Sequence, residues 1–143
     1  MKVKQIMTER VIPIHPEETV EVAARKLAHY NIGARPVCQQ DGELCGVVTD
    51  RDLVTRCMAA NRDPGATTVR QVMTGRVISV RGDMELSAAA HLMGAEQIRR
   101  LPVTENGRLC GMLSLGDLAA REEEIMEAAD ALNGISQKLS ERS

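Results

Sequence analysis

The chain has 143 residues and a formal net charge of −2, and 43% of its residues are hydrophobic although it holds one tyrosine and neither phenylalanine nor tryptophan. This length suits one compact unit with a real core, built from aliphatic side chains. The shortage of aromatic residues argues against sites that stack nucleic-acid bases, and the scattered basic residues argue against nucleic acid or an anionic membrane as a partner. No run of about 18 apolar residues is found, so no membrane location is expected.

Four cysteines, Cys38, Cys45, Cys57 and Cys110, form no C-x-x-C pair and have no histidines at zinc spacing. We therefore predict no metal site. Cys45 and Cys110 each stand just before a glycine in an apolar run, where a thiol acts as a small hydrophobic side chain. Free thiols of this kind predict a cytoplasmic location.

The opening segment of the chain recurs in its second half. Residues 3–8 (VKQIMT) are answered by residues 69–74 (VRQVMT). Each copy is followed by a β-rich run, residues 11–14 and 77–80, and each run predicts a strand.

An amphipathic helix is predicted next in each half, because apolar residues recur at i, i+3, i+4, i+7 and i+8. The small residues among them suit close packing on a sheet. The two sets are Val20, Ala23, Ala24, Leu27 and Ala28, and Leu86, Ala89, Ala90, Met93 and Gly94.

Two more strands follow in each half, over residues 35–38 and 44–49 and then over residues 101–104 and 109–114. A proline at the start of the first strand of each pair favours an edge position or an irregular start. The dipeptides Asp41-Gly42 and Asn106-Gly107 between the strands predict hairpin turns.

Each half ends on the same octapeptide pattern, GVVTDRDL at residues 46–53 and GMLSLGDL at residues 111–118. A hydroxyl residue (Thr49, Ser114) stands where a helix should begin, and an aspartate (Asp52, Asp117) follows three residues later. One interpretation is a variant of the capping box that satisfies backbone donors. The other is a nucleotide site, because a helix N-terminus attracts phosphate and a carboxylate can accept both ribose hydroxyls.

The repeats predict an α+β fold of two tandem β-α-β-β-α units packed with pseudo-twofold symmetry, since neither unit can bury a full core alone. The predicted boundaries are residues 1–60 for the first repeat, 61–68 for a linker, 69–121 for the second repeat and 122–143 for a C-terminal helical extension. The extension carries a heptad-like apolar seam, which either packs on its own module or contacts a partner.

Taken together, the motifs that recur in both halves resemble a tandem pair of CBS (cystathionine β-synthase) domains over roughly residues 2–121. These motifs are M-T, V-I-x-[IV], the Ala-rich helix, P-V, the turn and G-h-h-[ST]-x-x-D-L. The resemblance implies a disc-like module whose clefts bind adenosine-containing ligands such as AMP, ADP, ATP or S-adenosylmethionine. It implies that Asp52 and Asp117 hold the ribose, with Thr49 and Ser114 near phosphate. It also implies that apolar residues of the first strand flank adenine, namely Val11, Ile12, Val77 and Ile78.

The repeats differ in their basic residues: Arg35 and Arg51 stand in the first, and Arg100 in the second. These three side chains either meet phosphates or are solvated surface charges. We favour the second-repeat cleft, because Arg100 adds positive charge there and no acid stands at the position that corresponds to Asp50.

We expect a regulatory small-molecule sensor, such as an energy sensor, rather than an enzyme. No catalytic residue is predicted, since His15, His29 and His91 lack partners and no Walker-type loop is found. No cofactor is required beyond the regulatory nucleotide, and an unidentified effector protein is a further possible partner. The alternative is a ligand-free structural or dimerisation module. An apolar helix face predicts a homodimer; its candidates are Leu53, Val54, Cys57, Met58, Leu118, Ile125 and Met126.

Overall fold

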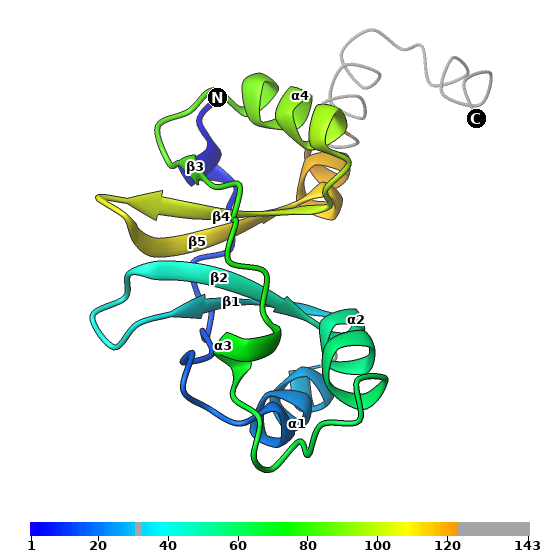
Figure 1. The fold of residues 1–143 in the computed structure, drawn as a ribbon. Helices are drawn as coiled ribbons and strands as arrows, with labels where there is room; N and C mark the ends of the chain where they lie inside the picture. The colour runs from blue at the N-terminus through cyan, green and yellow to red at the C-terminus, as the bar shows by residue number, and fades with distance from the viewer. Residues whose placement is uncertain (31–32, 123–143) are drawn as a thin grey trace, which may run out of the picture.

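The computed structural model describes residues 1–30 and 33–122. It confirms the predicted mixture of helices and small sheets: strands β1 and β2 pair in one sheet, and β3, β4 and β5 in a second. Figure 1 shows the two sheets in the middle of the molecule, with α1, α2 and α3 beyond the first sheet and α4 beyond the second. No helix among the described residues is long and apolar enough to cross a membrane.

The first half holds α1 (Val20–Tyr30), β1 (Ala34–Cys38) and β2 (Leu44–Thr49), and then the short α2 (Asp50–Leu53), which continues as the π-helical turn η2 (Val54–Met58). Strands β1 and β2 are antiparallel. The predicted hairpin turn lies between them, where Gly42 has a φ of +93° that glycine adopts without strain.

The second half begins with the short helix α3 (Val69–Val72) and holds β3 (Val80–Arg81), α4 (Leu86–Glu96), β4 (Arg100–Glu105) and β5 (Arg108–Ser114). Residues 115–122 are helical. Strand β4 pairs with β3 in parallel and with β5 antiparallel. Asn106 and Gly107 both have positive φ, as a type I′ hairpin turn requires.

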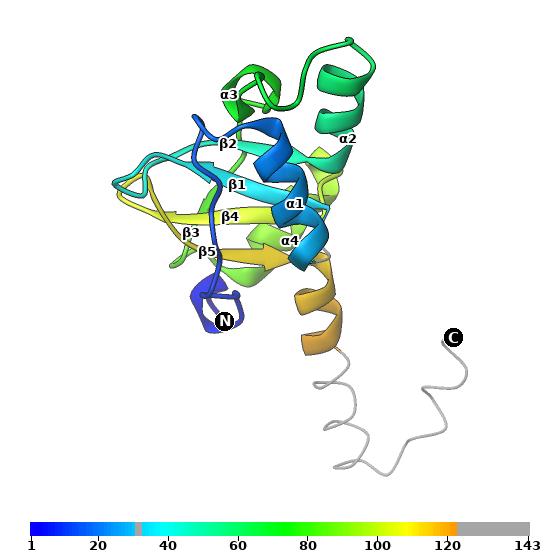
Figure 2. The ribbon, with the colours of Figure 1, turned by 90° about the horizontal axis from the view of Figure 1, so that it is seen from below.

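The opening segment of each half packs in the hydrophobic core of the other half. Val3 of the short 3-10 helix η1 (Val3–Gln5) is fully buried among Val80, Leu101 and Leu113 of the second half. Conversely, Val69 and Val72 of α3 lie in the first core. Figure 2 shows the N-terminal segment crossing the strands from η1 towards α1.

Short backbone contacts hold these crossing segments in place. Thr8 pairs with Met112 of β5 through hydrogen bonds of 2.8 and 2.9 Å, and Thr74 pairs with Val47 of β2 through bonds of 3.0 and 2.9 Å. The two hairpins also meet, since the N–H of Leu44 donates to the carbonyl of Gly107. The halves therefore form one continuous unit.

The strand predicted over residues 11–14 is wrong. Only Ile14 bridges to β1, where its N–H donates to the Pro36 carbonyl at 3.0 Å and its carbonyl accepts from the Cys38 N–H at 2.9 Å. The carbonyl of Ile12 accepts from the Arg35 side chain instead of a strand partner. Of residues 77–80, only Val80 belongs to a strand.

The predicted edge position is wrong for Pro102, since β4 is the middle strand of its sheet. Its ring is tolerated because β3 joins β4 only at Val103 and Thr104, beyond the proline.

The apolar faces predicted for α1 and α4 are only partly buried. Val20, Ala23 and Leu27 of α1 and Ala89 and Met93 of α4 are buried, as predicted. The i+4 and i+8 positions of the same stripes are exposed: Ala24, Ala28, Ala90 and Gly94.

Candidate functional site

A cleft of about 250 Å³ lies where the two halves meet. The first half contributes the crossing segment after Thr8 and the start of β1. The second half contributes the start of β4, the end of β5 and the helix after it. The lining residues are Thr8, Arg10, Val11, Ala34, Arg35, Pro36, Arg100, Met112, Ser114 and Asp117.

A reciprocal cap fixes the hydroxyl and the carboxylate of this cleft. The N–H of Asp117 donates to Ser114 Oγ at 3.0 Å, and the N–H of Ser114 donates to Asp117 Oδ2 at 3.0 Å. The pattern arises locally, because residues at N-cap and N3 face the same unsatisfied donors at a helix start. The cap uses Oδ2, which leaves Oδ1 with no hydrogen bond to the described part of the chain.

The first half has the same cap with different surroundings. Thr49 and Asp52 exchange hydrogen bonds of 3.0 and 2.9 Å. Asp52, however, is 9% exposed, and its Oδ1 lies 3.9 Å from Arg56 Nε. Arg56 Nη1 also donates to the carbonyls of Val72 and Met73, at 3.2 and 3.1 Å. The Asp52 carboxylate is therefore tied to the end of α3.

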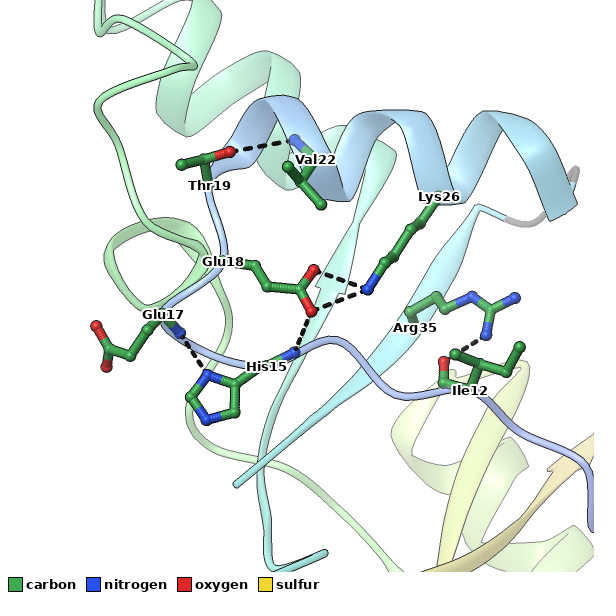
Figure 3. A network of polar contacts seen from close by, with 8 residues as sticks. All are labelled: Ile12, His15, Glu17, Glu18, Thr19, Val22, Lys26 and Arg35. Carbon is green, nitrogen blue, oxygen red and sulfur yellow. Dashed lines mark hydrogen bonds and ion pairs between the residues drawn. The ribbon is translucent and has the colours of Figure 1, made fainter. Parts of the chain in front are cut away.

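Arg35 is a charged side chain in a core position. It is 4% exposed, its guanidinium carbon lies 4.3 Å from the ring centroid of Tyr30, and Nη1 donates to the carbonyl of Ile12 (Figure 3). Its Nε is buried without a hydrogen-bond partner among residues 1–30 and 33–122. Burial lowers the pKa of Arg35, because water no longer stabilises the charge.

A separate set of polar contacts, not joined to Arg35, lies between Lys26 of α1 and the segment that precedes α1 (Figure 3). Lys26 Nζ contacts both carboxylate oxygens of Glu18, at 2.8 and 2.9 Å. The N–H of His15 donates to the same carboxylate at 3.4 Å, and the N–H of Glu17 donates to His15 Nδ1 at 3.2 Å.

The second half is apolar in the corresponding places. Leu101 replaces Arg35, Leu92 replaces Lys26 and Met84 replaces Glu18, and all three pack in the second core. The two repeats therefore differ in chemistry beneath the same backbone pattern.

A comparison with known families decides what this arrangement is. The family model of the CBS domain matches residues 3–59 and again residues 69–124. The chain belongs to the CBS domain family. The resemblance seen in the repeated motifs is thereby confirmed.

Relatives of similar length support the assignment. The CBS domain-containing protein YhcV of Bacillus subtilis is 41% identical over 134 residues, which are 94% of either chain. Hypoxic response protein 1 of Mycobacterium tuberculosis is 32% identical over 116 residues, 81% of either chain. Neither the family model nor these relatives' names assign a catalytic activity to the chain.

Solved structures show the same fold. The crystal structure of Hypoxic Response Protein I with two coordinated zinc ions has a TM-score of 0.77 and 31% identity, over 84% of this chain and 98% of that one. The CBS domain pair of protein MJ0100, solved with 5′-methylthioadenosine and S-adenosyl-L-methionine, has a TM-score of 0.75 and 26% identity, over 87% and 97%. The predicted tandem CBS pair is confirmed.

The cleft brings together five of the site residues predicted from the sequence: Val11, Arg35, Arg100, Ser114 and Asp117. The remaining predicted residues, which do not line it, are Thr49, Asp52, Ile12, Arg51, Val77 and Ile78. Ile12 is 46% exposed, and Ile78 packs against the second core.

Sequence reasoning missed Thr8, Arg10 and Met112 of the cleft. The repeated M-T pair was a signal for Thr8, because a motif that recurs in both CBS repeats marks a fixed position. Arg10 and Met112 meet only through the pairing of Thr8 with β5, which joins distant parts of the chain.

A larger groove, of about 830 Å³, lies between α1 and α2 of the first CBS repeat, and neither capping aspartate lines it. Val54 and Met58 on its rim are 52% and 74% exposed, whereas Leu53 and Cys57 are buried. Of the other predicted interface residues, Leu118 packs against the second core. Ile125 and Met126 lie outside the described residues, as do residues 123–143 of the predicted extension.

Cys45 and Cys110 lie at corresponding positions of the two CBS repeats. Cys45 Sγ donates to the carbonyl of Val37 at 3.3 Å, and Cys110 Sγ to the carbonyl of Val103 at 3.4 Å. Burial raises the pKa of both thiols. Within residues 1–30 and 33–122, no three His, Cys, Asp or Glu side chains are grouped so as to hold a metal ion.

Proposed function

We propose that this protein is a regulatory sensor whose cleft at Asp117 binds an adenosine-containing small molecule. The observation that carries the proposal is the meeting of Val11, Ser114 and Asp117 in one cleft between the two CBS repeats. The complex of the MJ0100 CBS pair with two adenosine derivatives supports it by similarity.

Each residue has a chemical role in this proposal. Asp117 accepts hydrogen bonds from the ribose hydroxyls through the oxygen that its cap leaves unused. Val11 lies against the adenine, and Ser114 lies near the first group beyond the ribose. The cleft is slightly smaller than the range of about 300–1,000 Å³ typical of ligand sites. It would therefore enclose the nucleoside and leave the rest of the ligand at its mouth.

Thr49 and Asp52 of the first CBS repeat, together with Val77 and Ile78 of the second, would form a second cleft by pseudo-symmetry. We propose that the Asp117 cleft is the working one. Its carboxylate is half-buried and free of an ion pair to the described residues, whereas the Asp52 carboxylate is buried beside Arg56. A ligand at Asp52 would have to displace that contact.

The test is a thermal-shift panel of AMP, ADP, ATP, S-adenosylmethionine and NAD, followed by calorimetric titration of the compounds that raise the melting temperature. A ligand specific to the folded state stabilises it by RT ln(1 + [L]/Kd). Asp117→Asn should lower the affinity about tenfold to a hundredfold, because it weakens charge-assisted hydrogen bonds.

Asp52→Asn is the matched control and should leave that affinity unchanged. If none of the five compounds shifts the melting temperature, the alternative of a ligand-free structural module replaces the sensor.

A homodimer is our second proposal, and the groove beside α1 favours it. Val54 and Met58 are exposed there, and Ala24 and Ala28 leave the adjoining helix face flat. An uncovered apolar face of this kind is typical of an interface. Sedimentation velocity should show a dimer for the wild type and a monomer for Val54→Asp/Met58→Asp; a wild-type monomer at micromolar concentration would contradict the proposal.

A further inference from the structure

We propose that Arg35 is a positioning residue of the Asp117 cleft: it holds the crossing segment so that Val11 faces the ligand, and it does so at a cost in folding stability. This inference rests on the proposed function and adds to it a residue that acts through its neighbours. The guanidinium group, on β1, donates to the carbonyl of Ile12, the residue next to Val11 (Figure 3).

The crossing segment has few other contacts of this kind between Thr8 and Ile14. Its two ends are fixed, because Thr8 pairs with β5 and Ile14 pairs with β1. The one backbone hydrogen bond of residues 9–13 stays within the segment. Among the described residues, only the Arg35 side chain donates a hydrogen bond to residues 9–13 from outside the segment. The position of Val11 therefore depends on Arg35.

The second CBS repeat lacks this anchor. Leu101 stands at the position of Arg35 and has no side-chain donor. Residues 75–79, which correspond to residues 9–13, receive no hydrogen bond from elsewhere in the described ranges. Val77 and Ile78 of that segment line neither the Asp117 cleft nor the larger groove. The crossing segment that contacts an arginine is thus the one that lines a cleft.

The same arginine is unfavourable for the fold. Arg35 is 4% exposed, and its Nε has no hydrogen-bond partner in the part of the chain that the structure describes. The Tyr30 ring, 4.3 Å from the guanidinium carbon, offsets part of the cost of burying the charge. An apolar side chain avoids that cost, as Leu101 does in the second core. Packing alone therefore does not account for an arginine at this position.

The test replaces Arg35 with methionine, a flexible apolar side chain that fills similar space without a donor. Ile12 is 46% exposed, so water can satisfy the carbonyl that loses its partner. The midpoint of denaturant unfolding of Arg35→Met should equal or exceed that of the wild type.

Ligand affinity should change in the opposite sense. Calorimetric titration of Arg35→Met should show at least about tenfold weaker binding of adenosine and of 5′-methylthioadenosine, as expected if the segment adopts its binding conformation about a tenth of the time. Both compounds are uncharged, so a lost attraction between charges cannot produce this result.

Nitrogen-15 relaxation of the ligand-free protein gives a readout that needs no ligand. The order parameters of the amides of residues 10–12 should fall from about 0.85 to below about 0.6 in Arg35→Met. Those of Thr8 and Ile14 should stay unchanged, because backbone pairing holds both residues in the variant as well.

Arg99→Met is the matched control, since Arg99 is exposed and does not line the cleft, and it should change neither affinity nor order parameters. Arg35→Lys keeps a charged donor and should lose less affinity than Arg35→Met. A clearly lower midpoint, unchanged order parameters or unchanged affinity in Arg35→Met would overturn the inference. If the wild type binds neither compound, the proposed adenosine site fails, whereas the midpoint and the order parameters still decide the role of Arg35.

Discussion

The sulfur of Met7 lies 2.7 Å from the position that a β-carbon would take on Gly111, and the carbonyl oxygen of Thr8 lies 2.9 Å from it. The same relationship joins Met73 and Thr74 to Gly46, with the same two distances. Real β-carbons do not approach other atoms so closely. Each crossing segment thus requires a glycine on the strand that it meets.

Gly111→Ala should lower the free energy of unfolding by about 1–3 kcal/mol, the usual cost of overpacking. Denaturant titration measures this change. Gly94→Ala is the control, because nothing lies within 4 Å of its added β-carbon and alanine favours a helix. Adding Met7→Ala to Gly111→Ala should recover only part of the loss, since the Thr8 carbonyl remains. A Gly111→Ala variant as stable as the wild type would show that the segment is not held there.

Lys26→Leu should destabilise the protein by about 1–3 kcal/mol, because it leaves the half-buried Glu18 carboxylate without its cation. The double variant Lys26→Leu/Glu18→Met copies the residues of the second repeat and should be more stable than the single variant. Thermal and denaturant unfolding of the four proteins of this double-mutant cycle check both statements. Equal stability of the single and the double variant would contradict the pairing.

Arg56→Met should destabilise the protein by about 1–3 kcal/mol, because the carbonyls of Val72 and Met73 lose their donor and Asp52 loses its nearest cation. The neighbouring Arg51→Met should change stability by less than about 0.5 kcal/mol, since surface substitutions away from such contacts have small effects. Chemical denaturation compares the two. Similar losses in both variants would mean that Arg56 does not hold α3.

Burial raises the pKa of Cys38 to about 11. The folded protein therefore holds this proton more tightly than the unfolded chain, so the stabilisation is fully present below pH 9 or so and is lost as the pH rises towards about 11. The free energy of unfolding of the wild type should fall on the order of 1–2 kcal/mol further across this range than that of Cys38→Ala. Parallel pH series of the two proteins would test this, and superimposable slopes would refute the prediction.

Features set by neighbouring residues could be predicted from the sequence. The caps at Thr49 and Ser114 and the turns at Gly42 and Gly107 are determined within a few residues, and the structure has them where the pattern placed them. The strand expected over residues 11–14 failed because pairing also depends on distant contacts: only Ile14 bridges to β1, and the Ile12 carbonyl accepts from the Arg35 side chain.

Features that depend on distant contacts could not be predicted. The burial of Arg35 depends on Tyr30 and on the carbonyl of Ile12, which approach it only in the folded chain. Arg10 joins the cleft through the pairing of Thr8 with β5. The periodicity of apolar residues identified the face of α1 that includes Ala24. It carries no information on whether another helix or strand packs against each residue of that face.

The exchange of opening segments sets an order for folding during synthesis. The residues of the first core run from Ile14 to Val72 without a contribution from the start of the chain, so this core can close as soon as residue 74 has left the ribosome. The second core needs Val3 together with Leu113. Residues 1–8 are therefore synthesised first but can pack in their core only after β5 has been synthesised. Until then, their apolar side chains are exposed to solvent.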